Sequence, residues 1–311
     1  MNFRHLLLPI APDQQLDESF KEVLYFANEN SANVTLLTVI EGLDEYIEIS
    51  HYTGTTLGLL DNATKFYHQS LKHHVHAFRA QYPSIKFATL IKIGVPFIEI
   101  IKAAHEVQSS LIVIDTHRKK KSKPCQYGST TRHLMRKSDI PIWSCSMKPM
   151  AIRRVGVAVD VSNQEQVQFN EKILSLSMEF CSLTDAELIL IHAWRLDTEG
   201  FLRKWSGYSQ LDVALLAKKM REDHAGRMKS LLKPYENNLV KRKIKLLEGD
   251  AKQIIPSFID KESIDMVIMG SLARAGIAGF LIGNTAESML DQLSCSVLTL
   301  KPNEFHSPVL G

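Results

Sequence analysis

The sequence has few cysteines and no long hydrophobic run, and each absence excludes a class of protein. The cysteines lie far apart and form no CxxC pair or Cys/His spacing of a zinc site. No apolar run reaches the roughly 20 residues that span a bilayer, and Pro9 and Pro12 interrupt the apolar start of the chain. We therefore expect a cytoplasmic protein with reduced thiols. The four cysteines are Cys125, Cys145, Cys181 and Cys295.

The chain also lacks an excess of charge of either sign. Its 37 basic and 34 acidic residues are interspersed and give a net charge of +3. This balance argues against dedicated nucleic-acid binding, and a hydrophobic content of 45% is typical of globular proteins. The densest basic run, residues 118–123 (RKKKSK), is interpreted as a solvated loop, with anion capture or an acidic partner as the alternatives.

Motifs for catalysis and metal binding are missing as well. The sequence contains no GxxxxGK[ST], no GxGxxG and no nucleophile elbow, and no Ser/His/Asp or Cys/His arrangement is evident from local spacing. We therefore assign no catalytic residue and no metal ligand. One group of histidines has the spacing of a polar helix face and makes at most an incomplete zinc site: His68, His73, His74 and His76.

What the sequence does contain is an internal repeat. Residues 4–10 and 153–159 each combine a basic start with a continuous apolar run, the pattern of a strand buried on both faces. Apolar runs and amphipathic stretches then alternate in the same order in both halves. Two pairs of glycines keep the same spacing of 155 residues: Gly94 with Gly249, and Gly128 with Gly283. We predict two domains, residues 1–150 and 151–311.

The alternation of strands and helices defines the fold class. It predicts a doubly wound α/β fold in each half, with a mostly parallel five-stranded sheet and helices on both faces. In such sheets a ligand binds beyond the carboxyl ends of the strands. The residues that follow each strand are therefore the candidates for a site.

The most informative of these stretches follows the fourth strand of the second half. Residues 270–276 (GSLARAG) are followed by residues 283–287 (GNTAE), which open a helix. Glycines let the backbone approach an anion, and the free N–H groups at a helix start favour phosphate. Asn284 or Thr285 is expected to cap that helix. In the alternative interpretation, the glycines only turn the chain and the cap is only structural.

Two residues separate Gly270 from Ala273, and nine residues separate Ala273 from Gly283. This spacing resembles a motif of the universal stress protein family. Its nucleotide-binding members carry Gly-x-x-Gly, nine residues and Gly-Ser/Thr at this place. The resemblance covers nearly the whole chain twice, so the sequence is similar to tandem members of the UspE group. It implies an adenine nucleotide alpha hydrolase-like fold.

By this resemblance the second half binds ATP, with Mg²⁺, or a related phosphorylated metabolite. Asp160 matches the family's adenosine-contacting Asp, although an ordinary Asx turn or helix cap is the alternative. Ala273 and Asn284 depart from the family's Gly and Ser/Thr. The implied binding residues are Asp160, Ala193 (adenine, by its backbone), Gly249 and Asp250 (ribose), and Gly270, Ala273, Gly283, Asn284 and Thr285 (phosphates).

The first half departs further from the family pattern. It has Ala11 at the Asp position, Asp115 and Arg118 at the first two glycine positions, and keeps only residues 128–130 (GST). A carboxylate at position 115 would repel a phosphate. We therefore expect the first half not to bind ATP in the family's manner.

These observations predict a stress-response protein that acts as a nucleotide-binding sensor or regulator. The family roles in starvation, oxidant and DNA-damage tolerance come from the resemblance alone. Two alternatives remain: a slow ATPase or phosphotransferase, and a non-nucleotide ligand-binding or scaffold protein. We expect either that the two halves of one chain pair as a pseudo-dimer or that two chains form a homodimer. Several aromatic residues are expected to pack or to line a pocket: Tyr46, Tyr52, Phe201, Trp205 and Tyr208.

Overall fold

The structure is a computed structural model, and it describes residues 3–11, 14, 18–41, 57–115, 127–145, 151–196, 209–271 and 283–311. Within these ranges each half contributes five strands. Those of the first half are β1 (His5–Pro9), β2 (Asn33–Ile40), β3 (Lys86–Ile93), β4 (Leu111–Asp115) and β5 (Ile142–Cys145). Those of the second half are β6 (Arg154–Ala158), β7 (Glu187–Trp194), β8 (Arg242–Glu248), β9 (Met266–Gly270) and β10 (Ser296–Leu300).

The helices alternate with these strands as the sequence predicts. Those of the first half are α1 (Glu18–Glu29), α3 (Leu57–Gln81), α4 (Pro96–Glu106) and α5 (Ser129–Lys137). Those of the second half are α6 (Val167–Thr184), α8 (Gln210–Leu232), α9 (Ala251–Lys261) and α10 (Asn284–Leu290). Local signals fix several helix starts. Pro96 opens α4, and a Ser209/Asp212 capping box opens α8.

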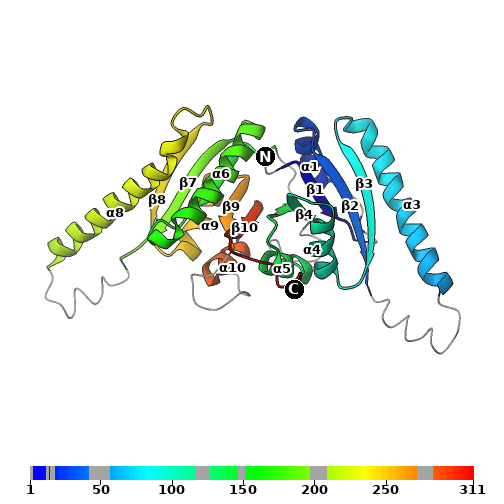
Figure 1. Cartoon of the computed structure of the whole chain (residues 1–311). Helices are drawn as coiled ribbons and strands as arrows, with labels where there is room; N and C mark the ends of the chain where they lie inside the picture. The colour runs from blue at the N-terminus through cyan, green and yellow to red at the C-terminus, as the bar shows by residue number, and fades with distance from the viewer. Residues whose placement is uncertain are drawn as a thin grey trace.

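The ten strands form one continuous sheet in the order β3-β2-β1-β4-β5-β10-β9-β6-β7-β8. Within each half all neighbouring strands are parallel, which confirms the predicted fold class. The halves meet where β5 and β10 pair antiparallel, with Trp143 opposite Leu298. Figure 1 shows the consequence: β5 and β10 lie at the centre, and the long helices α3 and α8 lie at the two outer ends.

Helices cover both faces of this sheet. Helices α1, α3, α6 and α8 pack on one face and share one apolar cluster that runs through both halves. Helices α4, α5, α9 and α10 pack on the other face over a second cluster. The inner strands are buried on both sides, as the continuous apolar runs predict.

Aromatic side chains from both halves meet beside the β5–β10 junction. Phe26 of α1 stacks on Phe180 of α6 with ring centroids 5.2 Å apart. Trp143 of β5 and Phe3 approach both rings edge-on, at 5.5–5.7 Å between centroids. All four side chains are buried. The first half therefore completes its core with a residue of the second.

The repeat extends to the backbone conformation. Apart from Gly311, the described residues with positive φ form pairs at equivalent positions: Ser31 with Asp185, Gly94 with Gly249, and Gln108 with Ser263. Gly94 and Gly249 have φ of +143° and +144°, which a residue with a side chain rarely adopts. Each donates its N–H to the last carbonyl of the neighbouring strand, Ile40 or Trp194. The positive φ of this turn therefore explains why glycine recurs at positions 94 and 249 of the two halves.

Candidate functional site

The predicted site residues that the structure describes lie at the carboxyl edge of the second-half sheet. Asp160 follows β6, Ala193 lies near the end of β7, and Gly249 and Asp250 follow β8. Gly270 ends β9, which pairs with β6, so Asp160 and Gly270 follow neighbouring strands. The order of strands changes direction between β6 and β9, and in this class of fold such a switch point is where ligands bind.

Asp160 forms an Asx turn. Its Oδ1 accepts hydrogen bonds from the Ser162 N–H at 3.0 Å and from the Ser162 hydroxyl at 2.5 Å. This Asx turn is the alternative interpretation of Asp160, and it does not prevent ligand contact because the residue is only partly buried. The turn presents the carboxylate at the end of β6.

Two side chains from neighbouring helices hold this turn. Asn170 of α6 is buried; its amide donates to the Asp160 carbonyl at 2.8 Å and its Oδ1 accepts from the Asp160 N–H. Arg227 of α8 donates to the carbonyls of Val161 and Ser162 at 3.0 and 3.1 Å. Sequence reasoning missed both residues, because each lies on an amphipathic helix where a polar residue is ordinary.

A pair of buried histidines lies beneath the same turn. The ring of His192 in β7 approaches the ring of His224 in α8 edge-on, with centroids 4.9 Å apart, and its Nδ1 lies 3.0 Å from the Val159 carbonyl. Burial lowers the pKa of His224, and Arg227 lowers it further. These two effects outweigh the opposite effects of Asp223 and Asp160 and favour the uncharged form of His224. Ala193 lies beyond Ile191, the last residue of β7 that is paired with β6.

Asp250 has local structural roles. Its Oδ1 accepts from the N–H of Lys252 at 3.0 Å and caps α9, while Oδ2 lies 2.9 Å from the guanidinium of Arg195. A ribose hydroxyl that bound this carboxylate would do so beside the Lys252 N–H and the Arg195 guanidinium, which already contact it. The equivalent first-half residue, Val95, makes no side-chain cap.

Gly270 is packed against a side chain of α6. A Cβ atom at this position would lie 2.4 Å from Cε1 and 2.7 Å from Cζ of Phe169. Real Cβ contacts are not this short, so a side chain at position 270 would displace the ring of Phe169. Close approach of a phosphate is therefore not needed to explain Gly270.

The predicted helix cap after Gly283 is wrong. The N-cap of α10 is Gly283 itself, and Asn284 and Thr285 are the first two residues of the helix. Neither residue occupies the cap position, so the start of α10 has no side-chain cap, and Thr285 is exposed. Serine, threonine and asparagine favour caps in general, but the turn places the glycine there. Ala273 lies outside the described residues.

At the equivalent place in the first half, the side chain of Gln14 lies between two strand ends. Gln14 accepts a hydrogen bond from the Ala11 N–H at 3.1 Å and donates to the Asp115 carboxylate at 3.0 Å. It thus joins the segment after β1 to the end of β4. The expectation that the first half does not bind ATP in the family's manner stays a prediction, and Gln14 is a side chain that the sequence analysis missed. Gly128 caps α5 without a side-chain bond, as Gly283 caps α10, and Arg118 lies outside the described residues.

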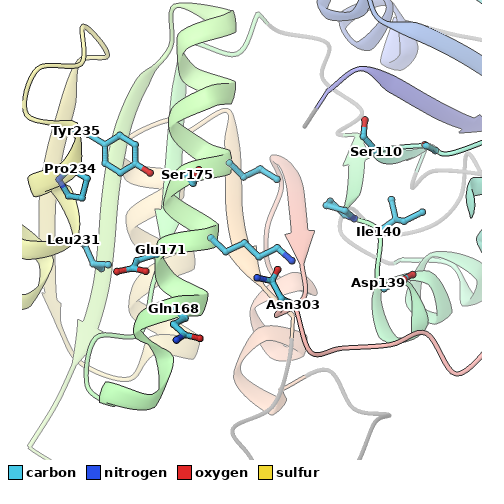
Figure 2. Close-up of a pocket in the computed structure, with 14 residues that line it drawn as sticks. Ser110, Asp139, Ile140, Gln168, Glu171, Ser175, Leu231, Pro234, Tyr235 and Asn303 are labelled. Carbon is cyan, nitrogen blue, oxygen red and sulfur yellow. The ribbon is translucent and has the colours of Figure 1, made fainter. Parts of the chain in front are cut away.

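A cavity lies elsewhere, between the two halves. It measures about 940 Å³ and has α6 on one side and the segments before β4 and β5 on the other (Figure 2). Several of its polar groups already have partners. Lys172 donates to the Lys301 carbonyl at 2.8 Å, and Asp139 lies 2.9 Å from the His105 ring nitrogen. The cavity is an inter-half groove and is separate from the predicted site residues.

The structure also describes most of the histidines and cysteines considered in the sequence analysis. Three histidines of α3 are exposed, while His74 stacks on Phe78 at 6.3 Å. The described ranges contain no group of three or more His, Cys, Asp or Glu side chains that would hold a metal. They also contain no disulfide, and burial raises the pKa of the Cys181 thiol to about 12. Residues 118–123 and the aromatic residues predicted to line a pocket lie outside the described ranges, as does Cys125.

Comparison with known proteins identifies the family. The model of the universal stress protein family matches residues 2–145 and again residues 151–301. The chain belongs to the universal stress protein family. Universal stress protein E of Escherichia coli strain K12 is 21% identical over 99% of this chain and 96% of its own length. The universal stress protein E homolog of Haemophilus influenzae is 23% identical over 98% of this chain and 99% of its own length.

Solved structures agree on the fold. Protein PA1789 of Pseudomonas aeruginosa, described as functionally unknown, superposes with a TM-score of 0.66 at 21% identity and covers 97% of this chain and 94% of its own. A universal stress protein from Archaeoglobus fulgidus gives a TM-score of 0.62 at 19% identity, with 97% and 98% covered. At such identities the likeness shows the fold alone. None of the helices that the structure describes has the length and apolarity required to cross a bilayer.

Proposed function

We propose that this universal stress protein binds ATP or a related phosphorylated metabolite in its second half, in the cytoplasm, and acts as a sensor or regulator. The proposal is supported most by the difference between the two halves at the same place. In the first half Gln14 and Asp115 join the ends of β1 and β4. In the second half the equivalent strand ends carry Asp160 and Gly270. The carboxylate of Asp160 can accept hydrogen bonds from hydroxyl groups, and the neighbouring strand β9 ends in Gly270, which has no side chain.

The surroundings of Asp160 suit a binding group. Asn170 and Arg227 hold its turn from two helices, so its carboxylate is positioned before any ligand arrives, which lowers the entropic cost of binding. We assign the adenosine to Asp160 and the Ala193 backbone, the ribose to Gly249 and Asp250, and the phosphates to the turn from Gly270 to Gly283. ATP brings Mg²⁺ as its ordinary counter-ion.

Calorimetry with MgATP tests this assignment. We expect binding by the wild type and a loss of about tenfold or more in Asp160→Ala, since a hydrogen bond to a charged group contributes about 1.5–3 kcal/mol. Gly283→Val is expected to abolish binding. Asp115→Ala, the matched change in the first half, should leave the affinity unchanged. Absence of heat and of thermal stabilisation at millimolar MgATP would refute the proposal.

Two alternatives have distinct outcomes. Slow hydrolysis or phosphoryl transfer would appear as phosphate release that disappears in Asp160→Ala. The inter-half cavity of about 940 Å³ favours a non-nucleotide ligand as the second candidate function. Native mass spectrometry of freshly purified protein separates these cases, because a retained ligand has a measurable mass.

A further inference from the structure

The outer end of the first half lacks acidic residues over a long stretch. Residues 62–98, which form most of α3 and all of β3, contain no Asp and no Glu. A segment of this length would hold about four at the average of the whole chain, which has 34 acidic residues in 311. The same segment contains five Lys or Arg residues and four histidines. Without any contribution from histidine, its charge exceeds the net charge of +3 of the whole chain.

Three of these basic residues form a stripe along α3. Lys65, Lys72 and Arg79 follow one another at intervals of seven residues, which is about two helical turns, so they lie on the same side of the helix. The steps between them are about 10.5 Å along the helix axis. All three residues are exposed, and none forms an ion pair with another residue that the structure describes. This side of α3 is therefore an uncompensated line of positive charge.

The equivalent helix of the second half, α8, has a different surface. Its acidic residues alternate with its basic ones, so Lys218 lies 4.0 Å from Glu222 and Arg227 lies 2.7 Å from Asp223. Both helices lie at an outer end of the same sheet and pack on the same face of it (Figure 1). The fold therefore does not require a stripe of unpaired cations at this position. The stripe is a property of the first half alone.

An exposed aromatic residue accompanies the stripe. Phe66 directly follows Lys65 and is 65% exposed, and its ring meets that of Tyr67 edge-on with centroids 5.3 Å apart. Water is an unfavourable environment for so large an apolar side chain. Cations beside an exposed phenylalanine on one helix are typical of helices that lie in the interface of a membrane. The long axis of α3 runs along the outer end of the molecule, where a flat surface can approach it (Figure 1).

We propose that the exposed side of α3 docks on the surface of an anionic phospholipid bilayer. Lys65, Lys72 and Arg79 contact the headgroups, and Phe66 enters the interface beside them. A nucleic-acid backbone would attract the same cations, but its phosphates offer no place to bury a phenylalanine, whereas the interface does. The contact is peripheral, which agrees with the absence of a membrane-crossing helix among the helices that the structure describes.

Vesicle sedimentation with the full-length protein tests the charge stripe. Each Lys or Arg near an anionic surface strengthens binding by about fivefold, so three contribute about 100-fold. We expect binding to vesicles of phosphatidylcholine with phosphatidylserine, and about 100-fold weaker binding to phosphatidylcholine alone. The triple variant Lys65→Gln, Lys72→Gln, Arg79→Gln should lose about the same factor. Added salt should weaken the binding of the wild type, because it screens exposed charges.

A matched variant of α8 separates the stripe from the overall charge. Lys218→Gln, Lys219→Gln, Lys229→Gln removes three exposed cations from the equivalent helix and should bind the anionic vesicles as the wild type does. All six substituted residues are exposed, so both triple variants are expected to fold, which circular dichroism and the melting temperature verify.

Fluorescence tests the place of Phe66. The emission of Phe66→Trp should shift to the blue when anionic vesicles are added, because the new ring leaves water for the interface. Leu215→Trp is the control, since Leu215 is 56% exposed on α8 and its replacement should show no shift. Phe66→Ser should bind the vesicles several-fold more weakly and keep the salt dependence, because the three cations remain.

The outcomes decide between partners. Equal binding to vesicles with and without phosphatidylserine would refute the proposal, and so would equal losses in the two triple variants. Binding of duplex DNA or polyglutamate as tight as that of the anionic vesicles, with no blue shift in Phe66→Trp, would show that the partner is a soluble polyanion and would refute the lipid surface. None of these measurements involves ATP, so the result is independent of the proposed function.

Discussion

The contact between Gly270 and Phe169 allows a test of why this position is glycine. Gly270→Ala places a Cβ atom 2.4 Å from Cε1 and 2.7 Å from Cζ of Phe169. Overpacking of this kind costs about 1–3 kcal/mol, because the ring of Phe169 must move from its position beside β9. We expect a loss of about 2 kcal/mol in the free energy of unfolding, measured by urea denaturation.

A double-mutant cycle assigns this loss to the contact. Phe169→Leu removes both clashing atoms, so Gly270→Ala made in that background should cost less than about 0.5 kcal/mol. Gly226→Ala is the control, because this glycine lies in α8 with open space where the added methyl group would go, and the change should stabilise the helix by up to about 1 kcal/mol. Additive losses at Gly270 and Phe169 would refute the packing explanation.

Three further predictions concern buried charges and a cap. Burial lowers the pKa of Lys301 from 10.5 to about 7, so the native state binds fewer protons between these values and stability rises with pH across that window. Lys301→Met should remove the rise and stabilise the protein by roughly 3–5 kcal/mol at pH 6 in urea titrations; an unchanged pH profile would contradict this. Burial raises the pKa of Glu22 from 4.5 to about 7, so stability falls as pH rises through that range. Glu22→Gln should therefore stabilise by about 1–2 kcal/mol at pH 8 and by little at pH 4, in the same assay. Asp250→Ala should lower the melting temperature, because it removes the α9 cap, worth about 1 kcal/mol, and the Arg195 pair; an unchanged melting temperature would show that the cap is dispensable.

The fold was predictable from the sequence because its strands are continuous apolar runs. Strands such as β1 and β4 are buried on both faces, and no other common element has that pattern over so few residues. The spacing of Gly94 and Gly249 marks a turn with positive φ that both halves use. The antiparallel pairing of β5 with β10 was not predictable, because Ile142–Cys145 is short and its pattern does not name a partner strand.

The site was predictable in position and only partly in detail. The predicted ends of the strands indicated where Asp160 and Gly270 lie. The side chains that contact them belong to other elements, and the sequence did not indicate which ones. Gln14 occurs in a polar segment where nothing distinguishes it, and Phe169 occurs on a helix where an aromatic residue is ordinary. The expected cap by Asn284 or Thr285 is wrong because α10 begins at Asn284, which leaves Gly283 at the cap position although serine, threonine and asparagine favour it in general.

The aromatic cluster of Phe3, Phe26, Trp143 and Phe180 has a consequence for how the chain unfolds. A chain of two repeats ordinarily melts in two steps when each repeat has its own core. Here the melting of either half would expose the rings of the other and the edge of β5 or β10. The two repeats are therefore expected to melt in a single transition, and a fragment cut between them would carry an unpaired strand edge that favours aggregation.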